Sequence, residues 1–324
     1  MDRRSLNPLR ELPLIARISA TYAAEKPDIV HHFTIKCVVY GSLIARWQGI
    51  ANRVNAVTGM GYVFSTESYR TQVLRPVVRG LLRAALGGNR SRLILQNKDD
   101  LAACTSANLA SRASMYLIMG SGIDTTRFRP APTGQERSVM RVLLASRLLW
   151  DKGIREYVEA ARLIAGQGLP VEFLLAGRPD PGNPGSVSEA EVAGWTQSGI
   201  IRYLGHVADM PRLLGEIDLA VLPSYREGVP RSLLEAAACG LPIVTTDAPG
   251  CREVVRHGIN GLLVPPRDSR ALAAAIQFMH ERPVERRRMG QEGRASVVGK
   301  FGQDSVFEKT FAVYRDLLSA ALQS

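Results

Sequence analysis

Residues 219–240 have the sequence LAVLPSYREGVPRSLLEAAACG. The apolar run predicts a buried strand at 219–222, and Pro230 before an alanine-rich segment predicts a helix that ends at Gly240. Glu227 then lies in the connecting loop, and Glu235 lies inside the helix. Loop carboxylates accept hydrogen bonds from hydroxyl groups, and the amides of a first helical turn attract anions. The stretch therefore predicts a ligand that carries both hydroxyl and phosphate groups.

The spacing of the two glutamates and the residues around them resemble the E-x7-E signature of the retaining glycosyltransferases of family four, which have the two-domain GT-B fold. The resemblance implies that Glu227 positions the donor sugar and that Glu235 reaches the ribose. The alternative is a solvated loop glutamate and an unrelated glutamate on a surface helix. The residues between them belong to the same donor-binding segment by resemblance: Gly228, Val229, Pro230, Arg231 and Ser232.

A basic segment follows the predicted strand at 142–145 and resembles the arginine-then-lysine segment of the same family, with Arg147 and Lys152 in these two places. When a nucleotide sugar is cleaved, negative charge grows on the departing diphosphate, so fixed cations stabilise the transition state more than the ground state. Arg147 offers a planar fork and Lys152 a mobile point charge. We expect Glu227, Arg147 and Lys152 to form the catalytic set, without a metal ion or other cofactor.

Two more turns follow predicted strands and match the order of turns in the family. Ligands of open α/β sheets bind beyond the carboxyl ends of the strands, which puts Gly177, Arg178 and Val207 on the donor side. The resemblance implies that the backbone near Val207 receives the nucleotide base. For His206 we favour a role in the turn over a catalytic role.

Strand and helix patterns alternate along the chain, which predicts parallel sheets and an α/β fold. Together with the resemblance, this predicts a GT-B architecture of two Rossmann-like parallel-sheet domains that face a cleft. We expect an acceptor-side domain at 1–131, a nucleotide-sugar domain at 132–300, and a C-terminal helix at 301–324 that packs back toward the first domain. Strands are expected at 28–33, 54–57, 93–96 and 115–118, and then at 142–145, 171–176, 201–204, 219–222 and 242–245.

The first domain departs from the family at its beginning. A mononucleotide-binding half opens with a strand and a glycine-rich turn, whereas residues 7–25 predict a helix. We expect two or three strand–helix units, roughly 70–90 residues, to be absent upstream of Met1, so that the domain is N-terminally truncated. The absent part would supply the glycine-rich loop that faces the donor phosphates, and this puts turnover in doubt.

Residues 26–36 and 56–62 resemble the subgroup that uses undecaprenyl-diphosphate-linked sugars, so the resemblance implies a lipid-linked acceptor. His31 and His32 point to opposite faces of a strand, and at most one of them faces the cleft. We choose His32 as the acceptor-side candidate. A buried structural histidine is an equal alternative for it.

Three further residues concern the acceptor. Lys36 would meet an acceptor diphosphate, or it is an ordinary lysine at a helix start. Many relatives carry a histidine where this chain has Thr58 and Gly59, so one familiar catalytic group is missing. Retaining chemistry remains open, because the preferred account for the family is front-face attack by the acceptor hydroxyl while the leaving phosphate assists deprotonation.

The chain of 324 residues has a formal net charge of +11, and most of its 41 basic residues are arginines. Such a charge favours anionic partners, namely nucleotide phosphates and acidic lipids. Aromatic residues make up only 6% and no recognition motif is present, so we expect no nucleic-acid partner. The four cysteines lack metal-ligand spacing and predict reduced thiols in the cytoplasm.

Arginines at 70, 75, 79 and 83 run beside an apolar stripe, which predicts a basic amphipathic helix that is kinked or restarted at Pro76. One hypothesis is docking on anionic lipid, to which each cation near the surface contributes about 1 kcal/mol. The alternative is a stripe packed in the core with the arginines in water. Since the sequence has no apolar run of 18 residues, we expect a peripheral location on the inner face of the cell membrane.

Taken together, these features predict a metal-independent retaining glycosyltransferase of bacterial polysaccharide, lipopolysaccharide or glycan assembly. It would move a hexose or N-acetylhexosamine from a UDP-linked donor to an undecaprenyl-diphosphate-linked saccharide. The alternative is a truncated homologue that binds nucleotide sugars and acts as a regulatory partner without turnover. A GT-B sugar epimerase is disfavoured, because the arginine–lysine and glutamate pairs are both present.

Overall fold

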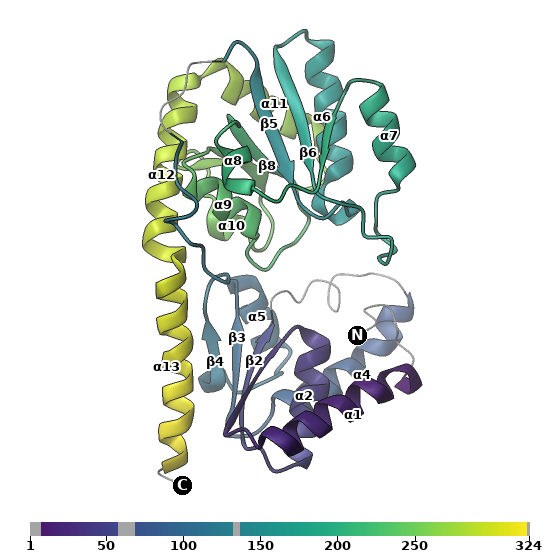
Figure 1. Cartoon of the computed structure of the whole chain (residues 1–324), viewed down its shortest axis with the longest axis vertical. Coiled ribbons are helices and arrows are strands. Elements are labelled where there is room, and N and C mark those ends of the chain that lie inside the picture. Colours follow the sequence, from purple (N-terminus) through teal and green to yellow (C-terminus); the bar gives the residue numbers. More distant parts are fainter. Residues whose placement is uncertain (1–7, 58–68, 132–136, 323–324) are drawn as a thin grey trace. The chain divides into compact units, whose positions relative to one another are not determined.

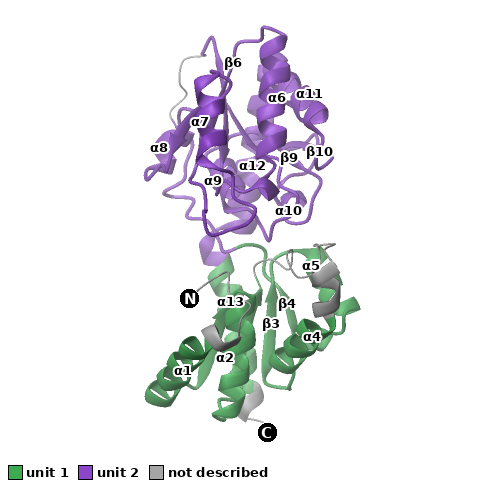
Figure 2. Ribbon diagram, turned by 90° about the vertical axis from the view of Figure 1, so that its right-hand side faces the viewer, with its two compact units in different colours: residues 1–120, 306–324 green, residues 121–305 purple. Residues whose placement is uncertain are grey.

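The computed structural model describes residues 8–57, 69–131 and 137–322 (Figure 1). The chain divides into two compact units: residues 1–120 and 306–324 form unit 1, and residues 121–305 form unit 2 (Figure 2). Every strand pair in both sheets is parallel. The prediction of an α/β fold with two parallel sheets is therefore confirmed.

Unit 1 is built on a four-stranded sheet in the order β1-β2-β3-β4. Its strands are β1 (Ile29–Phe33), β2 (Asn52–Val57), β3 (Ser91–Leu95) and β4 (Met115–Leu117). The helices between and before them are α1 (Pro8–Glu25), α2 (Ile35–Trp47), α4 (Tyr69–Leu86) and α5 (Lys98–Ser106), with a short 3-10 turn η1 at Arg112–Ser114.

Alternation along the strands gives this sheet two apolar faces, as expected for parallel strands that are covered on both sides. One face packs on α2 and α4, and Val57, Leu93 and Leu95 contribute to it. The other face includes Val54, Ala56 and Ile94, and it is covered by the C-terminal helix α13 (Gln303–Leu322). Asp316 of α13 fixes this helix further, because it accepts hydrogen bonds from Arg92 and Tyr116 at 2.8 and 2.7 Å.

Unit 2 contains a six-stranded sheet in the order β10-β9-β8-β5-β6-β7. Its strands are β5 (Met140–Ala145), β6 (Val171–Ala176), β7 (Arg202–Gly205), β8 (Leu219–Leu222), β9 (Ile243–Thr246) and β10 (Gly261–Val264). Its helices are η2 (Trp150–Lys152), α6 (Ile154–Gly166), α7 (Glu189–Gln197), α8 (Met210–Leu214), α9 (Arg231–Ala238), α10 (Cys251–Val254), α11 (Ser269–Glu281) and α12 (Pro283–Phe301).

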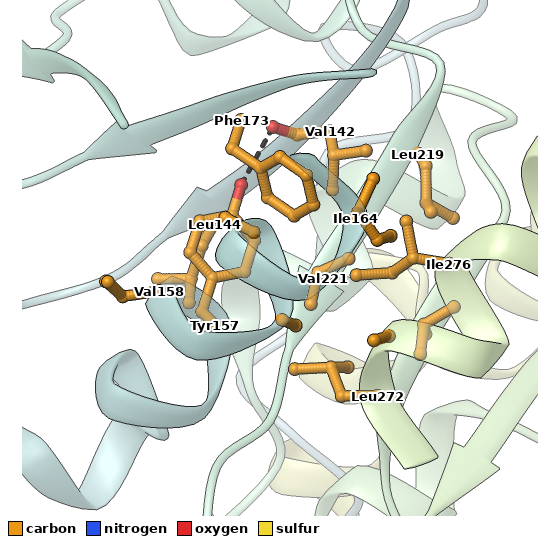
Figure 3. Close-up of a cluster of buried hydrophobic side chains, with 14 of the residues drawn as sticks. Val142, Leu144, Tyr157, Val158, Ile164, Phe173, Leu219, Val221, Leu272 and Ile276 are labelled. Carbon is orange, nitrogen blue, oxygen red and sulfur yellow. Dashed lines mark hydrogen bonds between the residues drawn. The ribbon is translucent and has the colours of Figure 1, made fainter. Parts of the chain in front are cut away.

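The core of unit 2 lies between α6, α11 and the centre of the sheet, where Tyr157 is wholly buried (Figure 3). A buried phenol must find hydrogen-bond partners, and Tyr157 donates to the carbonyl oxygens of Val142 and Leu174, both at 2.9 Å. These bonds hold α6 against β5 and β6. The start of α6 is thereby fixed next to the carboxyl end of β5.

Three details differ from the sequence-based expectations. The expected boundary between the domains lay at residue 131, but residues 121–131 belong to unit 2. Ile123 and Phe128 are buried, and the backbone amide of Ile123 donates a hydrogen bond to the carbonyl of Phe301. Helix α4 runs through Pro76 without a restart. Residues 261–264, where no strand was expected, form the edge strand β10.

Within the described ranges, no helix is both long enough and apolar enough to cross a membrane.

Candidate functional site

The sheet of unit 2 reverses its winding direction at β5. From β5 the chain adds β6 and β7 on one side, and β8 and β9 then follow on the other side. In open α/β sheets such a switch point leaves a crevice at the carboxyl ends of the two diverging strands, and ligands bind there. Here the position that the rule assigns to a ligand falls between the segment after β5 and the segment after β8.

These two segments carry Lys152 and Glu227, which the structure joins directly. Nζ of Lys152 lies 2.8 Å from Oε1 of Glu227, and 11% and 18% of the two side chains are exposed. Lys152 also lies 3.7 Å from a carboxylate oxygen of Asp151. Partial burial strengthens such a pair relative to one in water. The two residues that the sequence placed 75 positions apart thus form one charged centre.

The loop after β8 is held by hydrogen bonds along its whole length. The buried hydroxyl of Ser224 donates to Oε1 of Glu227 at 2.9 Å and lies 3.1 Å from the carbonyl oxygen of Asp151. The amide of Tyr225 donates to the same carbonyl, and the amide of Glu227 donates to the carbonyl of Pro249. Glu227 is therefore positioned by three neighbouring segments. Sequence reasoning missed Ser224, although its place directly beyond a buried strand could have indicated it.

Close backbone approach also requires glycine at Gly153, between η2 and α6. Its φ is 72°, and a Cβ there would overlap the carbonyl oxygen of Pro223. Gly250, with a φ of 82°, approaches the carbonyls of Glu227 and Gly228 in the same manner. Under this loop lies Cys251, and burial raises the pKa of its thiol to about 12. The thiol is therefore neutral beside the Lys152–Glu227 pair.

Arg147, the third member of the expected catalytic set, is placed differently. Its guanidinium is exposed and lies 3.3 Å from a carboxylate oxygen of Asp180, which follows β6. Gly177 also follows β6, and its φ of 135° lets it approach the carbonyl of Ser146 more closely than any side chain would allow. Arg147 thus belongs to the β5–β6 side of the sheet edge, and Lys152 to the β5–β8 side.

The rest of the expected donor segment lies at the start of α9. Gly228, Val229 and Pro230 are buried, with Pro230 as the residue that caps the helix. Glu235 accepts a hydrogen bond from Nε of Arg231 at 2.9 Å, one helical turn earlier, and 16% of its side chain is exposed. Ser232 is half-buried, Arg178 and His206 are exposed, and Val207 is half-buried beyond β7.

The acceptor-side candidate His32 is buried in unit 1. Its Nδ1 lies 2.8 Å from Oδ1 of Asn55 and its Nε2 lies 2.7 Å from the hydroxyl of Tyr22. Burial lowers the pKa of His32 and so favours the neutral ring. The ring also fills the space above Gly41 of α2. This geometry favours the structural alternative for His32.

Lys36 lies in the first turn of α2, and its Nζ lies 2.8 Å from Oε1 of the buried Glu11 of α1. The other two acceptor-side candidates, Thr58 and Gly59, lie outside the described residues.

Two arginines of the expected basic helix make contacts within unit 1. Arg79 donates to the carbonyl of Ala107, and Arg83 donates to the carbonyls of Ala107 and Asn108. These carbonyls end α5, where cations interact favourably with the helix dipole. The side chains of Arg70 and Arg75 lie outside the described part of the chain.

The arrangement in unit 2 can bind an anion whose neighbouring group carries hydroxyls. Lys152 supplies a nearly buried cation, and Glu227 supplies a hydrogen-bond acceptor 2.8 Å away from it. Among the residues that the structure describes, no three His, Cys, Asp or Glu side chains cluster in a way that could hold a metal ion.

Two protein families match the chain in succession. Residues 1–97 match the family described as "Glycosyl transferase 4-like", and residues 140–282 match "Glycosyl transferases group 1".

Curated relatives extend over most of the chain. One is the N,N'-diacetylbacillosaminyl-diphospho-undecaprenol alpha-1,3-N-acetylgalactosaminyltransferase of Campylobacter jejuni, which is 28% identical over 86% of this chain and 75% of its own length. Another is the capsular polysaccharide biosynthesis glycosyltransferase CapM of Staphylococcus aureus, which is 23% identical over 98% of this chain and 84% of its own.

Solved structures share the fold. Anabaena Alr3699/HepE in complex with UDP has a TM-score of 0.76 at 22% identity, and the match covers 94% of this chain and 82% of that one. Sucrose-phosphate synthase of Thermosynechococcus elongatus has a TM-score of 0.79 at 24% identity, with 95% and 78% covered. The match in both cases spans the two units of the chain described above.

Proposed function

Because this chain belongs to the GT-B glycosyltransferases of the group 1 and 4-like families, we propose that it transfers a hexose or N-acetylhexosamine, with retention, from a UDP-linked donor to a lipid-linked saccharide. The observation that carries the proposal is the contact between Lys152 and Glu227 at the switch point of unit 2. The names of the relatives support the acceptor class, since the Campylobacter enzyme and an Escherichia coli galactosyltransferase, 25% identical, are both named for diphosphoundecaprenol acceptors. The process served would be bacterial polysaccharide or glycan assembly.

In this proposal the donor diphosphate lies against Lys152 and the sugar lies against Glu227. The ammonium of Lys152 has three donors, so a diphosphate oxygen shares it with the carboxylate. As the glycosidic bond breaks, charge builds on the diphosphate, and a fixed cation in a partly buried site stabilises that charge. Glu227 orients the sugar hydroxyls and is not a nucleophile. The acceptor hydroxyl attacks from the same face, and the leaving phosphate takes its proton.

Arg147 and the residues beyond β6 and β7 complete the donor site in this proposal. Arg147 would exchange its exposed contact with Asp180 for a phosphate oxygen, and the backbone near Val207 would receive the base. Glu235 would leave Arg231 to meet the ribose. Since the cations are supplied by side chains, we propose that no metal ion takes part.

A panel of UDP-, GDP- and dTDP-linked sugars, tested with undecaprenyl-diphosphate-linked saccharides, checks transfer. We expect a UDP-sugar to give a product whose new linkage keeps the anomeric configuration, and EDTA to leave the rate unchanged. Binding of UDP without transfer to any acceptor in the panel would instead identify a non-catalytic nucleotide-sugar-binding protein.

Removal of the central cation tests the mechanism. We expect Lys152→Ala and Glu227→Ala each to lower kcat by about 10²–10³-fold, because each takes away a group that acts on the reacting donor. The matched control is Arg162→Ala, which removes an exposed cation of α6 that pairs with Glu159, and it should retain full activity. Equal rates in Lys152→Ala and the control would contradict the mechanism.

We also propose that the chain meets its acceptor at an anionic membrane surface on the inner face of the cell membrane. The net charge of +11 supports this, as does α4, where the apolar side chains of Val77 and Leu81 are 58% and 44% exposed. Leu82 and Leu86 of the same helix are buried, so the helix packs on the core and still presents apolar surface. Arg79 and Arg83 of the same helix contact the end of α5 through their guanidinium groups.

Sedimentation with lipid vesicles checks the membrane proposal. We expect binding to phosphatidylglycerol vesicles that weakens with salt, weak binding to phosphatidylcholine, and a clear loss with the double variant Val77→Glu/Leu81→Glu. Val284→Glu is the control, because Val284 of α12 is 68% exposed but belongs to unit 2. If both variants bind like the unmodified chain, α4 is not the docking element.

A further inference from the structure

A second link joins the Glu227 loop to α6, beside the Lys152–Glu227 pair. The hydroxyl of Tyr225 donates to Oε1 of Glu156 at 2.8 Å. Glu156 lies in the first turn of α6, three residues beyond Gly153. On the ring face of Tyr225 lies the guanidinium of Arg267, 4.8 Å from the ring centroid. Tyr225 is therefore held by α6 and by the segment between β10 and α11.

This cluster is built at a cost to stability. Glu156 is 6% exposed, and its Oε2 is buried without a hydrogen-bond partner. A buried carboxylate with one unsatisfied oxygen destabilises a fold, and an apolar side chain of similar volume is often neutral or stabilising in such a place. Arg267 has a φ of 62°, in the left-handed region that non-glycine residues rarely adopt.

The Tyr225 phenol is a stable hydrogen-bond donor in this cluster. Burial and the hydrogen bond to Glu156 raise the pKa of Tyr225 to about 12, so the phenol keeps its proton and donates.

We propose that Tyr225 is a positioning residue for the sugar half of the donor, which it serves by fixing the loop that carries Glu227 two residues later. The start of this loop is tied to the carbonyl oxygen of Asp151 by the Tyr225 amide and the Ser224 hydroxyl, and those bonds do not need the Tyr225 side chain. The side chain adds a second anchor, on Glu156 and under Arg267. Without it the loop retains its backbone bonds, and Glu227 retains its contacts with Lys152 and Ser224, but the segment between Ser224 and Glu227 loses its side-chain anchor and holds the Glu227 carboxylate less rigidly. This inference rests on the proposed function, in which Glu227 contacts the sugar.

The inference makes a ligand-specific prediction. The base and the phosphates would be bound at Val207, Arg147 and Lys152, which are not part of the Tyr225–Glu156–Arg267 cluster, whereas the sugar depends on the orientation of Glu227. Loss of the anchor should therefore weaken the binding of a UDP-sugar and leave the binding of UDP unchanged. A residue that only stabilised the fold would affect both ligands together.

Calorimetric titration with UDP and with UDP-N-acetylgalactosamine tests this in Tyr225→Phe, Glu156→Leu and Glu156→Gln. We expect the first two to raise the Kd of the UDP-sugar about tenfold and to leave that of UDP within about twofold. Glu156→Gln should behave like the unmodified chain, because its amide oxygen accepts the same bond. The double variant Tyr225→Phe/Glu156→Leu should bind the UDP-sugar no more weakly than either single variant, since each single change already removes the same hydrogen bond.

Thermal unfolding and a control variant separate positioning from stability. We expect the Tm of Glu156→Leu to equal or exceed that of the unmodified chain, because the unsatisfied carboxylate is gone. Tyr314→Phe removes a phenol hydroxyl from unit 1, where it lies 2.6 Å from Nδ1 of His31, and it should change neither Kd. Parallel losses of Tm and of both affinities, or unchanged affinity for the UDP-sugar in Tyr225→Phe, would overturn the inference.

Failure of the inference and failure of the proposed function give different results. If transfer occurs and Tyr225→Phe binds both ligands normally, only the inference falls. If the panel shows no transfer but the variants still lose affinity for the UDP-sugar and not for UDP, the inference holds for donor binding and the proposed function is wrong.

Discussion

Gly153 and Gly199 have the same backbone φ of 72° but different surroundings. A Cβ on Gly153 would overlap the carbonyl oxygen of Pro223, whereas a Cβ on Gly199 would meet no atom within 4 Å. The first glycine lies between Lys152 and α6, and the second ends the turn after α7. Substitution at these two glycines thus separates two effects on stability, that of a left-handed backbone and that of a steric overlap with a neighbouring loop.

Alanine at the two positions should have unequal effects on the stability of unit 2. Gly199→Ala pays only for the left-handed conformation, about 1 kcal/mol. Gly153→Ala must also displace the loop after β8, and we expect a loss of about 3 kcal/mol or more. Urea unfolding followed by the fluorescence of Trp150 and Trp195 measures both variants. Equal losses would mean that the loop yields at little cost.

Among the helices and strands, the contact between β1 and α13 depends on a histidine. Nδ1 of His31 lies 2.6 Å from the hydroxyl of Tyr314, its ring stacks on Phe33, and its Nε2 is buried without a partner. Burial, with a smaller effect of His32, lowers the pKa of His31 to about 4. The folded chain therefore holds His31 neutral at a pH where an unfolded chain would protonate it.

Stability of unit 1 should fall in mildly acidic solution. The folded pKa lies below the unfolded value of about 6.5, so the unfolded state binds more protons between these values and the free energy of unfolding decreases as the pH falls from 6.5 to 4. Since the side chain is partly exposed, we expect a loss of about 1–2 kcal/mol. Urea unfolding across this pH range measures the slope.

The variant His31→Leu should flatten this pH dependence, and His206→Asn, in unit 2, should leave it unchanged. A slope that persists in His31→Leu would assign the effect to other groups.

Considered as a whole, the chain builds unit 1 from both of its ends. Val306, Val313 and Leu317 of α13 are buried against β2 and β3, more than 200 residues away in the sequence. Unit 1 therefore needs the last part of the chain, and unit 2 is made from the single stretch 121–305.

Substitutions in α13 should consequently affect one unit alone. We expect Leu317→Ala to lower the free energy of unfolding of unit 1 by about 2–5 kcal/mol, because it empties a fully buried site. The adjacent Leu318 is 41% exposed, and Leu318→Ala should cost much less. Hydrogen exchange resolves the two units, and binding of UDP by unit 2 should be unchanged in both variants. A loss of protection in unit 2 would contradict this independence.

Most strands of both sheets could be predicted from the sequence, because buried parallel strands are short apolar runs between turn residues. The edge strand β10 was missed, since its first residue, Gly261, is also the second residue of an Asn-Gly pair, which by itself indicates only a tight turn. His32 shows a further limit. The sequence predicted that His32 lies in a strand and that it points to the opposite face from His31. Whether its ring nitrogen binds a ligand or the hydroxyl of Tyr22 depends on how α1 packs on β1.

The sequence alone determined the fold class, the glycosyltransferase family and the two segments that carry Lys152 and Glu227, because strand–loop–helix patterns and residue spacing are local properties. Only the tertiary structure decided which of these groups meet: Lys152 pairs with Glu227, Arg147 with Asp180, and Tyr225 with Glu156. Each of these contacts joins two segments that follow different strands of the sheet. Strand order and the switch point at β5 bring them together, and these are properties of the assembled sheet.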